Sequence, residues 1–226
     1  MTGLSLTELE LTGPGLSQTA GATREAVWNE LLRERAATYP LPPHGHHPNF
    51  VGAKEAAAAL LAHPQVQAHR ILIVGAERAL YPFRKQALAA GLVLYIPDQK
   101  RAGWYLRLES VAGADLKRSR ELGEPRLRPE GASAAVLACV AAARDGGRLS
   151  KGFGWAWNGL PELNLPVFTV AHRRMLKDAL PCPPDSPVHL IGLPGEVVKV
   201  NCQPEVSREP DSPERLEQAN EGQPKS

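Results

Sequence analysis

The sequence predicts one doubly wound α/β domain, and the pattern of its apolar segments supports this prediction. Residues 71–74 and 92–96 are short, unbroken apolar runs of the kind found in strands buried on both faces of a sheet. A helical segment over residues 82–90 separates them, which is the spacing of a βαβ unit with parallel strands. Weaker strand patterns follow at residues 104–109, 134–141, 167–171, 188–191 and 197–200.

The composition fits a globular protein and argues against several functional classes. Of the 226 residues, 43% are hydrophobic and 22% are charged, so the chain is not wholly disordered. A net charge of only +2, without an RNP-type aromatic motif, argues against a nucleic-acid partner. The longest uncharged apolar run, residues 131–143, is too short to cross a bilayer, so we expect no membrane partner. The three cysteines form no CxxC pair, which argues against a disulfide framework or a cysteine-rich zinc site.

We place the folded domain at residues 21–200, between two tails. Residues 1–20 show no sustained periodicity and are expected to form a flexible tail, and residues 201–226 are expected to form a disordered acidic tail. The acidic tail carries a charge of −3 and the whole chain +2, which leaves about +5 on residues 1–200 and suits an anionic small molecule. The first fifteen residues contain two glutamates and no Lys or Arg, so we expect no signal peptide and a cytoplasmic location. The sequence does not distinguish a monomer from a dimer.

Two helices are expected before the first strand, with a proline-rich loop between them. Thr23 is suited to cap a helix that runs to Thr38, because apolar residues recur there about once per turn. Residues 39–50 contain four prolines, each of which disfavours helix in the residue before it, so an extended loop is expected there. An alanine-rich helix over residues 52–62 ends before Pro64.

The most informative segment for function is the glycine-rich stretch of residues 146–157, which follows a predicted strand. It contains four glycines together with Arg148 and Lys151. Ligands of α/β sheets bind at the carboxyl ends of strands, where glycines let backbone N–H groups approach phosphate oxygens and cations neutralise them. The segment has neither the Walker nor the Rossmann spacing, so a plain glycine-rich turn with solvated charges is the alternative interpretation.

Histidines and one cysteine are weaker candidates. His44, His46 and His47 lie close enough in sequence to chelate zinc, but no acidic or thiolate ligand lies nearby, which favours a polar loop. His172 ends a predicted strand and either lines a cleft or is hydrogen-bonded at the edge of the core. Cys139 lies within a predicted strand and is interpreted as a core residue. No Ser/His/Asp or Cys/His combination indicates a nucleophile.

Residues 147–155 (Gly-Arg-Leu-Ser-Lys-Gly-Phe-Gly-Trp) resemble the nucleotide-binding signature of the 5-formyltetrahydrofolate cyclo-ligase (methenyltetrahydrofolate synthetase) family. That signature reads Gly-x-Arg-hydrophobic-Gly-x-Gly-x-Gly-Tyr-x-Asp. Lysine before the second glycine points to the branch of methenyltetrahydrofolate synthetase domain-containing proteins. Further segments are similar to that branch, in the same order over about residues 20–200; they are residues 24–28, 48–50, 94–97, 100–103, 170–172 and 185–194.

The resemblance implies a single three-layer α/β/α domain with a mostly parallel sheet, of the ribose-phosphate-isomerase and CoA-transferase type. It also implies that ATP and Mg²⁺ bind at the glycine-rich loop beside a reduced folate. ATP would phosphorylate the formyl oxygen of 5-formyltetrahydrofolate, N10 would attack the activated carbon, and phosphate would leave as 5,10-methenyltetrahydrofolate forms. Positioning and charge neutralisation would be the main work of the protein. By position, the nucleotide-binding residues would be Arg24, Arg148, Lys151, Gly152, Phe153, Gly154 and Trp155, and the substrate-binding residues Phe50, Arg84 and His172.

The chain departs from the family pattern at positions that bear on catalysis. Ala20 stands where the family has a lysine, and Ser150 stands where it has a glycine. Trp157 occupies the position of a metal-binding acid, and an indole is no ligand for Mg²⁺, so Asp145 is considered as a substitute carboxylate. A second hypothesis is therefore a catalytically inactive member of the family that binds a nucleotide or another anion and has a regulatory or interaction role.

Overall fold

One large sheet organises residues 19–200, the part of the chain that the computed structural model describes. The two predicted tails lie outside the described residues, except that Thr19 caps the first helix and Ala20 begins it. The α-helices are α1 (Ala20–Arg33), α2 (Ala53–Ala62), α3 (Pro64–Gln67), α4 (Tyr81–Ala89) and α5 (Leu116–Leu122). The short 3₁₀ turns are η1 (Arg78–Leu80), η2 (Val111–Ala114), η3 (Pro161–Leu163) and η4 (Arg173–Met175). None of the described helices has the length and apolar character needed to cross a membrane.

The large sheet has eight strands and a parallel centre. In spatial order they are β14 (Glu196–Lys199), β13 (Leu190–Leu193), β10 (Val167–Val170), β7 (Ala134–Val136), β3 (Ile71–Val74), β4 (Val93–Pro97), β5 (Tyr105–Leu108) and β6 (Glu124–Arg126). The strands from β13 to β4 run parallel, whereas β14, β5 and β6 are each antiparallel to the strand beside them. The predicted α/β class with a mostly parallel sheet is confirmed, and so is the β3–α4–β4 unit.

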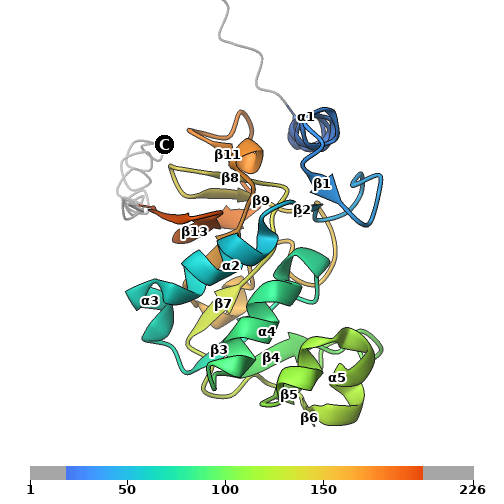
Figure 1. Cartoon of the computed structure of the whole chain (residues 1–226), viewed down its shortest axis with the longest axis vertical. Coiled ribbons are helices and arrows are strands. Elements are labelled where there is room, and N and C mark those ends of the chain that lie inside the picture. Colours follow the sequence, from blue (N-terminus) through green and yellow to red (C-terminus); the bar gives the residue numbers. More distant parts are fainter. Residues whose placement is uncertain (1–18, 201–226) are drawn as a thin grey trace, which may run out of the picture.

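Two smaller sheets complete the described structure (Figure 1). The first pairs β1 (Ala37–Thr38) with β2 (Asn49–Phe50), on either side of the proline-rich loop. The second has four strands in the order β11 (Leu176–Lys177), β8 (Ala141–Ala143), β9 (Gly147–Leu149) and β12 (Ser186–Pro187). This second sheet carries the glycine-rich loop, because that loop leaves the end of β9.

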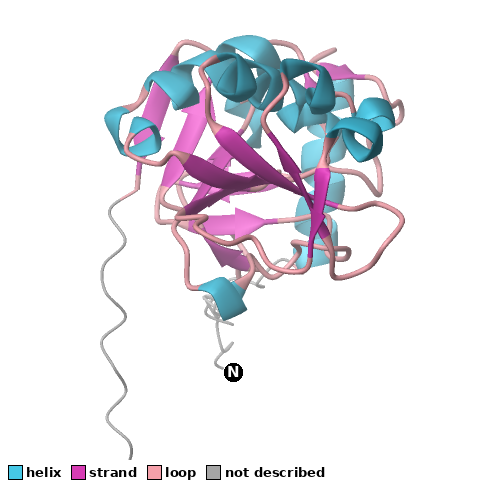
Figure 2. Ribbon diagram, turned by 90° about the horizontal axis from the view of Figure 1, so that it is seen from below, coloured by secondary structure: helices cyan, strands magenta, loops and turns pink. Residues whose placement is uncertain are grey.

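The two faces of the large sheet are covered differently. Leu72, Leu94 and Phe168 belong to the larger apolar cluster, on the face that α2 and α4 cover. Their neighbours along the strands point the other way, as successive strand residues must, and Ile73 and Tyr95 pack there against a smaller cluster. That second face is covered by residues 155–165 with the η3 turn, so the helices gather mostly on one side of the strand layer (Figure 2).

Two predicted elements differ from the structure for local reasons. The first helix begins at Ala20 rather than Thr23, because Thr19 accepts the Ala22 N–H, and it ends early because Arg35 adopts a left-handed φ of 52°. The predicted strand over residues 134–141 is two strands, β7 and β8, in different sheets. The residues between them are buried throughout, so the apolar pattern gives no sign that the chain passes from one sheet to the other.

Gly192 in β13 tests how α2 is seated on the sheet. A Cβ atom at this position would lie 2.7 Å from Leu60 Cβ and 2.8 Å from the Ala56 carbonyl oxygen. Gly192→Ala should therefore lower the free energy of unfolding by about 1–3 kcal/mol, the usual range for overpacking, as measured by urea denaturation. Gly21→Ala in α1 is the control and should be neutral or stabilising, because the nearest atom to its Cβ would be 3.9 Å away. Equal stability of Gly192→Ala and the parent chain would contradict the described seating of α2.

Candidate functional site

A cavity of about 340 Å³ opens at the carboxyl ends of β3 and β4. Four segments form its walls. They are residues 76–78 after β3, Pro97 at the end of β4, residues 151 and 153–156 of the glycine-rich loop, and the proline-rich loop at Pro40 and His47. In the sheet, β3 lies between β4, the next strand along the chain, and β7, to which the chain returns later. The cavity therefore lies at the switch in strand order, where open α/β sheets bind their ligands.

The glycine-rich loop brings Lys151 to this cavity. Gly152 and Gly154 adopt left-handed φ angles of 91° and 93°, which side chains other than glycine rarely allow. Lys151 folds back over Gly154, whose added Cβ would lie 3.4 Å from Lys151 Cε. The Lys151 ammonium lies 4.4 Å from the centre of the Phe153 ring, in a cation–π contact. The loop thus presents a cation and an aromatic ring on the same wall of the cavity.

Asp185 and Arg24 anchor the start of this loop. The Asp185 carboxylate accepts the Ser150 N–H at 2.8 Å and the Ser150 hydroxyl at 2.7 Å. It also forms a largely buried ion pair with Arg24, whose Nη2 lies 2.9 and 3.1 Å from the two carboxylate oxygens. Arg24 Nε in turn donates to the Ser150 carbonyl at 2.6 Å. The Ser150 hydroxyl thus adds a hydrogen bond to Asp185 that a glycine at this position would not supply. Arg24 contacts the loop and does not line the cavity.

Arg148 supports the same loop from below. Its side chain is fully buried and burial lowers its pKa. Its Nη2 donates to the Ala138 and Ala156 carbonyls at 2.7 and 3.1 Å, and its Nη1 donates to the Ser186 hydroxyl at 2.9 Å. Protein oxygens accept these donors, and Arg148 is not among the residues that line the cavity. Arg148 therefore positions the loop, and the nucleotide contact that the resemblance implies for it stays a prediction.

His47 and Glu77 form the inner wall of the cavity. His47 Nε2 accepts the Lys151 N–H at 3.2 Å, so the neutral ring carries its proton on Nδ1. That nitrogen lies 3.5 Å from Glu77 Oε1, which is too long for a hydrogen bond. Within residues 19–200, His47 Nδ1 and Glu77 Oε2 are both buried without a hydrogen-bond partner. Buried polar atoms of this kind at a cavity wall are normally satisfied by a ligand or by water.

The carboxylates of this region do not make a site for Mg²⁺. Among residues 19–200 there is no group of three or more His, Cys, Asp or Glu side chains that would hold a metal ion. Asp185 is occupied by Arg24 and Ser150, and Asp145 Oδ1 accepts the Gly147 N–H in the β8–β9 turn. Trp157 is half exposed and supplies no oxygen ligand from its side chain. Since Mg²⁺ needs several oxygen ligands, the described residues do not fit a resident ion.

The three candidate substrate-binding residues lie outside this cavity. Phe50 is buried, and its ring packs edge-on against His172 with the ring centres 6.1 Å apart. The His172 ring accepts the Arg174 N–H and caps η4, and burial lowers its pKa. Arg84 is buried and lines a different cavity beside α4. A role for Phe50 and His172 in substrate binding stays a prediction.

Sequence reasoning missed three residues of the cavity wall. His47 was interpreted as part of a polar loop, and neither Glu77 nor Arg78 was singled out. Glu77 and Arg78 follow β3 directly, so their position at the carboxyl end of a buried strand was a usable signal. No such signal exists for His47, because its contact with Lys151 joins residues 104 positions apart.

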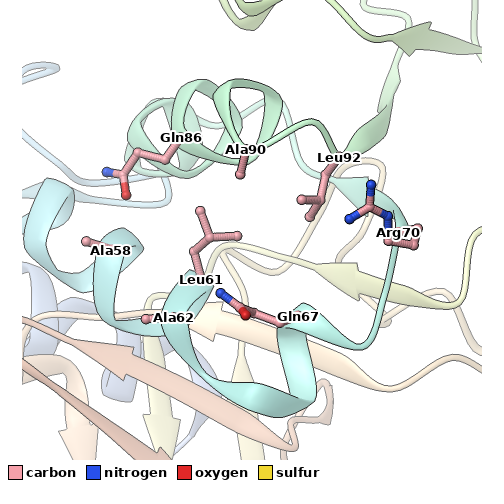
Figure 3. Close-up of a pocket in the computed structure, with 8 residues that line it drawn as sticks. All are labelled: Ala58, Leu61, Ala62, Gln67, Arg70, Gln86, Ala90 and Leu92. Carbon is pink, nitrogen blue, oxygen red and sulfur yellow. The ribbon is translucent and has the colours of Figure 1, made fainter.

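A further cavity of about 320 Å³ lies between α2, α3 and α4 (Figure 3). Figure 3 shows it lined by small and apolar side chains with two glutamines, and Arg70 is its charged residue. Arg70 and Leu92 immediately precede β3 and β4, so this cavity lies at the amino ends of the strands. That edge is opposite the one where α/β sheets bind ligands, and we do not assign it a function.

Comparison with known proteins gives a likeness to solved structures. No family model and no curated protein matches the chain. Among solved structures, the chain is similar to the NMR structure of 5,10-methenyltetrahydrofolate synthetase from Aquifex aeolicus, with a TM-score of 0.49 and 15% sequence identity. The match covers 82% of this chain and 97% of that chain. What this chain binds depends on its own residues.

The His47 environment predicts a pH dependence of stability. Burial, reinforced by the positive charges of Arg148, Lys151 and Arg24, holds the pKa of His47 well below 6.5. The unfolded chain therefore takes up this proton near pH 6.5 and the folded chain does not, so the stability from His47 is complete above that pH. As the pH falls further, the free energy of unfolding should decrease by up to about 1.4 kcal/mol per pH unit from this group.

The control for this prediction is His47→Gln, whose amide oxygen accepts the Lys151 N–H without titrating. His69 and His172 also have lowered pKa values and contribute with the same sign in both proteins. The difference between the two denaturation curves, measured at several pH values, therefore isolates His47. Parallel pH dependence of the two proteins would mean that His47 titrates normally in the folded state.

Proposed function

We propose that this chain binds a phosphorylated small molecule of the nucleotide class in the cavity beside Lys151, as a 5-formyltetrahydrofolate cyclo-ligase-like protein. The observation that carries the proposal is the way the glycine-rich loop lines the cavity. It places the Lys151 ammonium there, and no hydrogen bond within residues 19–200 is made by the N–H groups of residues 153–156. A cation with consecutive unpaired amides suits phosphate oxygens.

The charge around the cavity supports an anionic ligand. Lys151 and Arg78 contribute two cations, and Glu77 contributes one carboxylate. His47 adds no charge at neutral pH, because its pKa is lowered by burial. Phosphoryl transfer needs positioning and neutralisation from the protein more than covalent chemistry, and these residues supply both. No step is assigned to Mg²⁺, because the described residues do not fit it.

The second substrate has a place beside this cavity. Trp155 lines both the cavity near Lys151 and a larger one of about 720 Å³. Tyr105, Leu160 and Leu163 also line the larger cavity, and the Tyr105 ring meets Trp155 edge-on with the ring centres 5.9 Å apart. Aromatic and aliphatic walls suit a flat ring system, so a reduced folate is proposed to bind on the far side of Trp155 from the phosphates.

A non-catalytic role is the second candidate. It is favoured by Trp157, which stands where the family has an acid, and by the engagement of Arg24 and Arg148 with protein oxygens. Arg24 and Arg148 are thus occupied by the protein itself. Among the described residues that line the cavity, the cationic side chains available to a ligand are Lys151 and Arg78. This set holds an anion but stabilises developing charge less than a site with more preorganised donors. In this case the protein binds the nucleotide without turning over a folate.

Lys151→Ala tests the phosphate site directly. Loss of one charge-assisted hydrogen bond should weaken ATP binding roughly tenfold, as measured by isothermal titration calorimetry. Stability without ligand should change little, because Lys151 uses its backbone N–H, which alanine keeps, for the bond to His47. Lys54→Ala, on the exposed surface of α2, is the control for a general loss of positive charge. An unchanged dissociation constant for ATP in Lys151→Ala would show that Lys151 is an ordinary surface residue.

Turnover distinguishes the two candidate functions. The full chain, mixed with 5-formyltetrahydrofolate and Mg-ATP, should form 5,10-methenyltetrahydrofolate, which is followed by its near-ultraviolet absorbance. If folded protein at high concentration forms no product but ATP raises its melting temperature, the non-catalytic candidate is correct, because a ligand that binds the native state stabilises it. If ATP has no effect on the melting temperature either, the proposal of a nucleotide site fails.

A further inference from the structure

A second cavity beside α4 has the features of an anion site. It measures about 410 Å³ and lies between the loop after β3 and the start of α5. Arg78, Arg84 and Lys117 line it, against one carboxylate, Asp115. The Asp115 carboxylate accepts the Lys117 N–H at 3.0 Å as the cap of α5. The charged side chains around this cavity therefore sum to a positive balance of two.

Arg84 is the centre of this cluster. Its side chain is only 1% exposed and its position is fixed by three hydrogen bonds, from Nε to the Ala114 carbonyl and from Nη1 to the Gly75 and Glu77 carbonyls. Within residues 19–200, its Nη2 makes no hydrogen bond to the protein. Burial lowers the pKa of Arg84 to about 10, so the guanidinium remains charged at neutral pH. Nη2 is not among the buried atoms that lack a partner, so solvent reaches this nitrogen, and a ligand acceptor in the cavity that Arg84 lines would pair with it.

The surroundings of Arg84 favour an anionic acceptor over a neutral one. Arg78 and Lys117 are exposed and line the same cavity, where neither forms an ion pair with a described Asp or Glu side chain. The N–H groups of Arg84 Nε and Nη1 are taken up by protein carbonyls, so Nη2 is the nitrogen left to donate to one oxygen of a phosphate or carboxylate.

We propose that this cavity is a second oxyanion site, in which Arg84, Lys117 and Arg78 hold a phosphate or carboxylate group of a small molecule. The site is distinct from the cavity beside Lys151, although Ala76 and Arg78 line both. The two cavities thus meet at the loop after β3. The oxyanion belongs either to a second group of the ligand held at Lys151 or to a separate small anion, and the chemistry of recognition is the same.

Inorganic phosphate is the probe for this site. On titration of the full chain with phosphate at constant ionic strength, the backbone amide resonances of Arg78 and Lys117 should shift together. Lys117→Ala should weaken this binding roughly tenfold, as expected for the loss of one charge-assisted hydrogen bond. Lys85→Ala is the matched control, because Lys85 is exposed on the same helix as Arg84 but does not line the cavity. Absence of shifts at both amides, or equal weakening by Lys85→Ala, would overturn the proposal.

A second titration, with ATP, identifies the source of the oxyanion. If one ligand spans both cavities, Lys117→Ala weakens ATP binding as well as phosphate binding. If the oxyanion is a separate molecule, Lys117→Ala weakens phosphate binding and leaves the affinity for ATP unchanged. Either result supports the second oxyanion site. Phosphate binding by Lys117→Ala tests this site, whereas ATP binding by Lys151→Ala tests the nucleotide proposal. Failure of phosphate binding with intact ATP binding would remove the second site and leave the first.

Discussion

The buried, charge-assisted hydrogen bonds beneath the glycine-rich loop determine the rest of the candidate site. Asp185 accepts hydrogen bonds from Ser150 and Arg24 at the start of the loop. Arg148 donates to the Ala156 carbonyl within the loop and to the Ala138 carbonyl outside it. Removing one partner from such a buried pair leaves a charge without compensation, which is far more costly than the pair is worth. The loop conformation, and with it the left-handed backbone at Gly152 and Gly154, depends on these partners remaining in place.

This anchoring separates two roles that a motif alone merges. A sequence signature assigns every cation of the glycine-rich segment to the ligand, but a guanidinium in the core first has to satisfy its own N–H groups. Arg148 does so with protein oxygens, whereas Lys151 on the next turn keeps its ammonium at the cavity and gives only its backbone N–H to His47. Arg148, which shapes the loop, and Lys151, whose side chain lines the cavity, therefore lie three residues apart in the sequence.

The sequence predicted the features that depend on local patterns. The strand at residues 71–74 and the parallel β3–α4–β4 unit follow from periodicity and turn chemistry. The strand β9 at the start of the glycine-rich segment was not predicted, because its three residues carry no strand pattern of their own. The positioning roles of Arg24 and Arg148 and the burial of His47 did not follow. The hydrogen bonds of Arg24 to Ser150 and Asp185 span 126 and 161 positions, and a pattern read along the chain holds no information about which distant carbonyl a guanidinium meets.

The loop between β3 and α4 connects the two cavities mechanically as well as spatially. Arg84 binds the carbonyls of Gly75 and Glu77, so the backbone that carries Glu77 into one cavity and Arg78 to the edge of both is fixed by a side chain of the second cavity. An added Cβ at Gly75 would lie 2.0 Å from Glu77 Oε2, so a side chain at this position would displace the Glu77 carboxylate. An anion bound to Arg84 would therefore act on the same backbone that places the unpaired Glu77 oxygen beside His47.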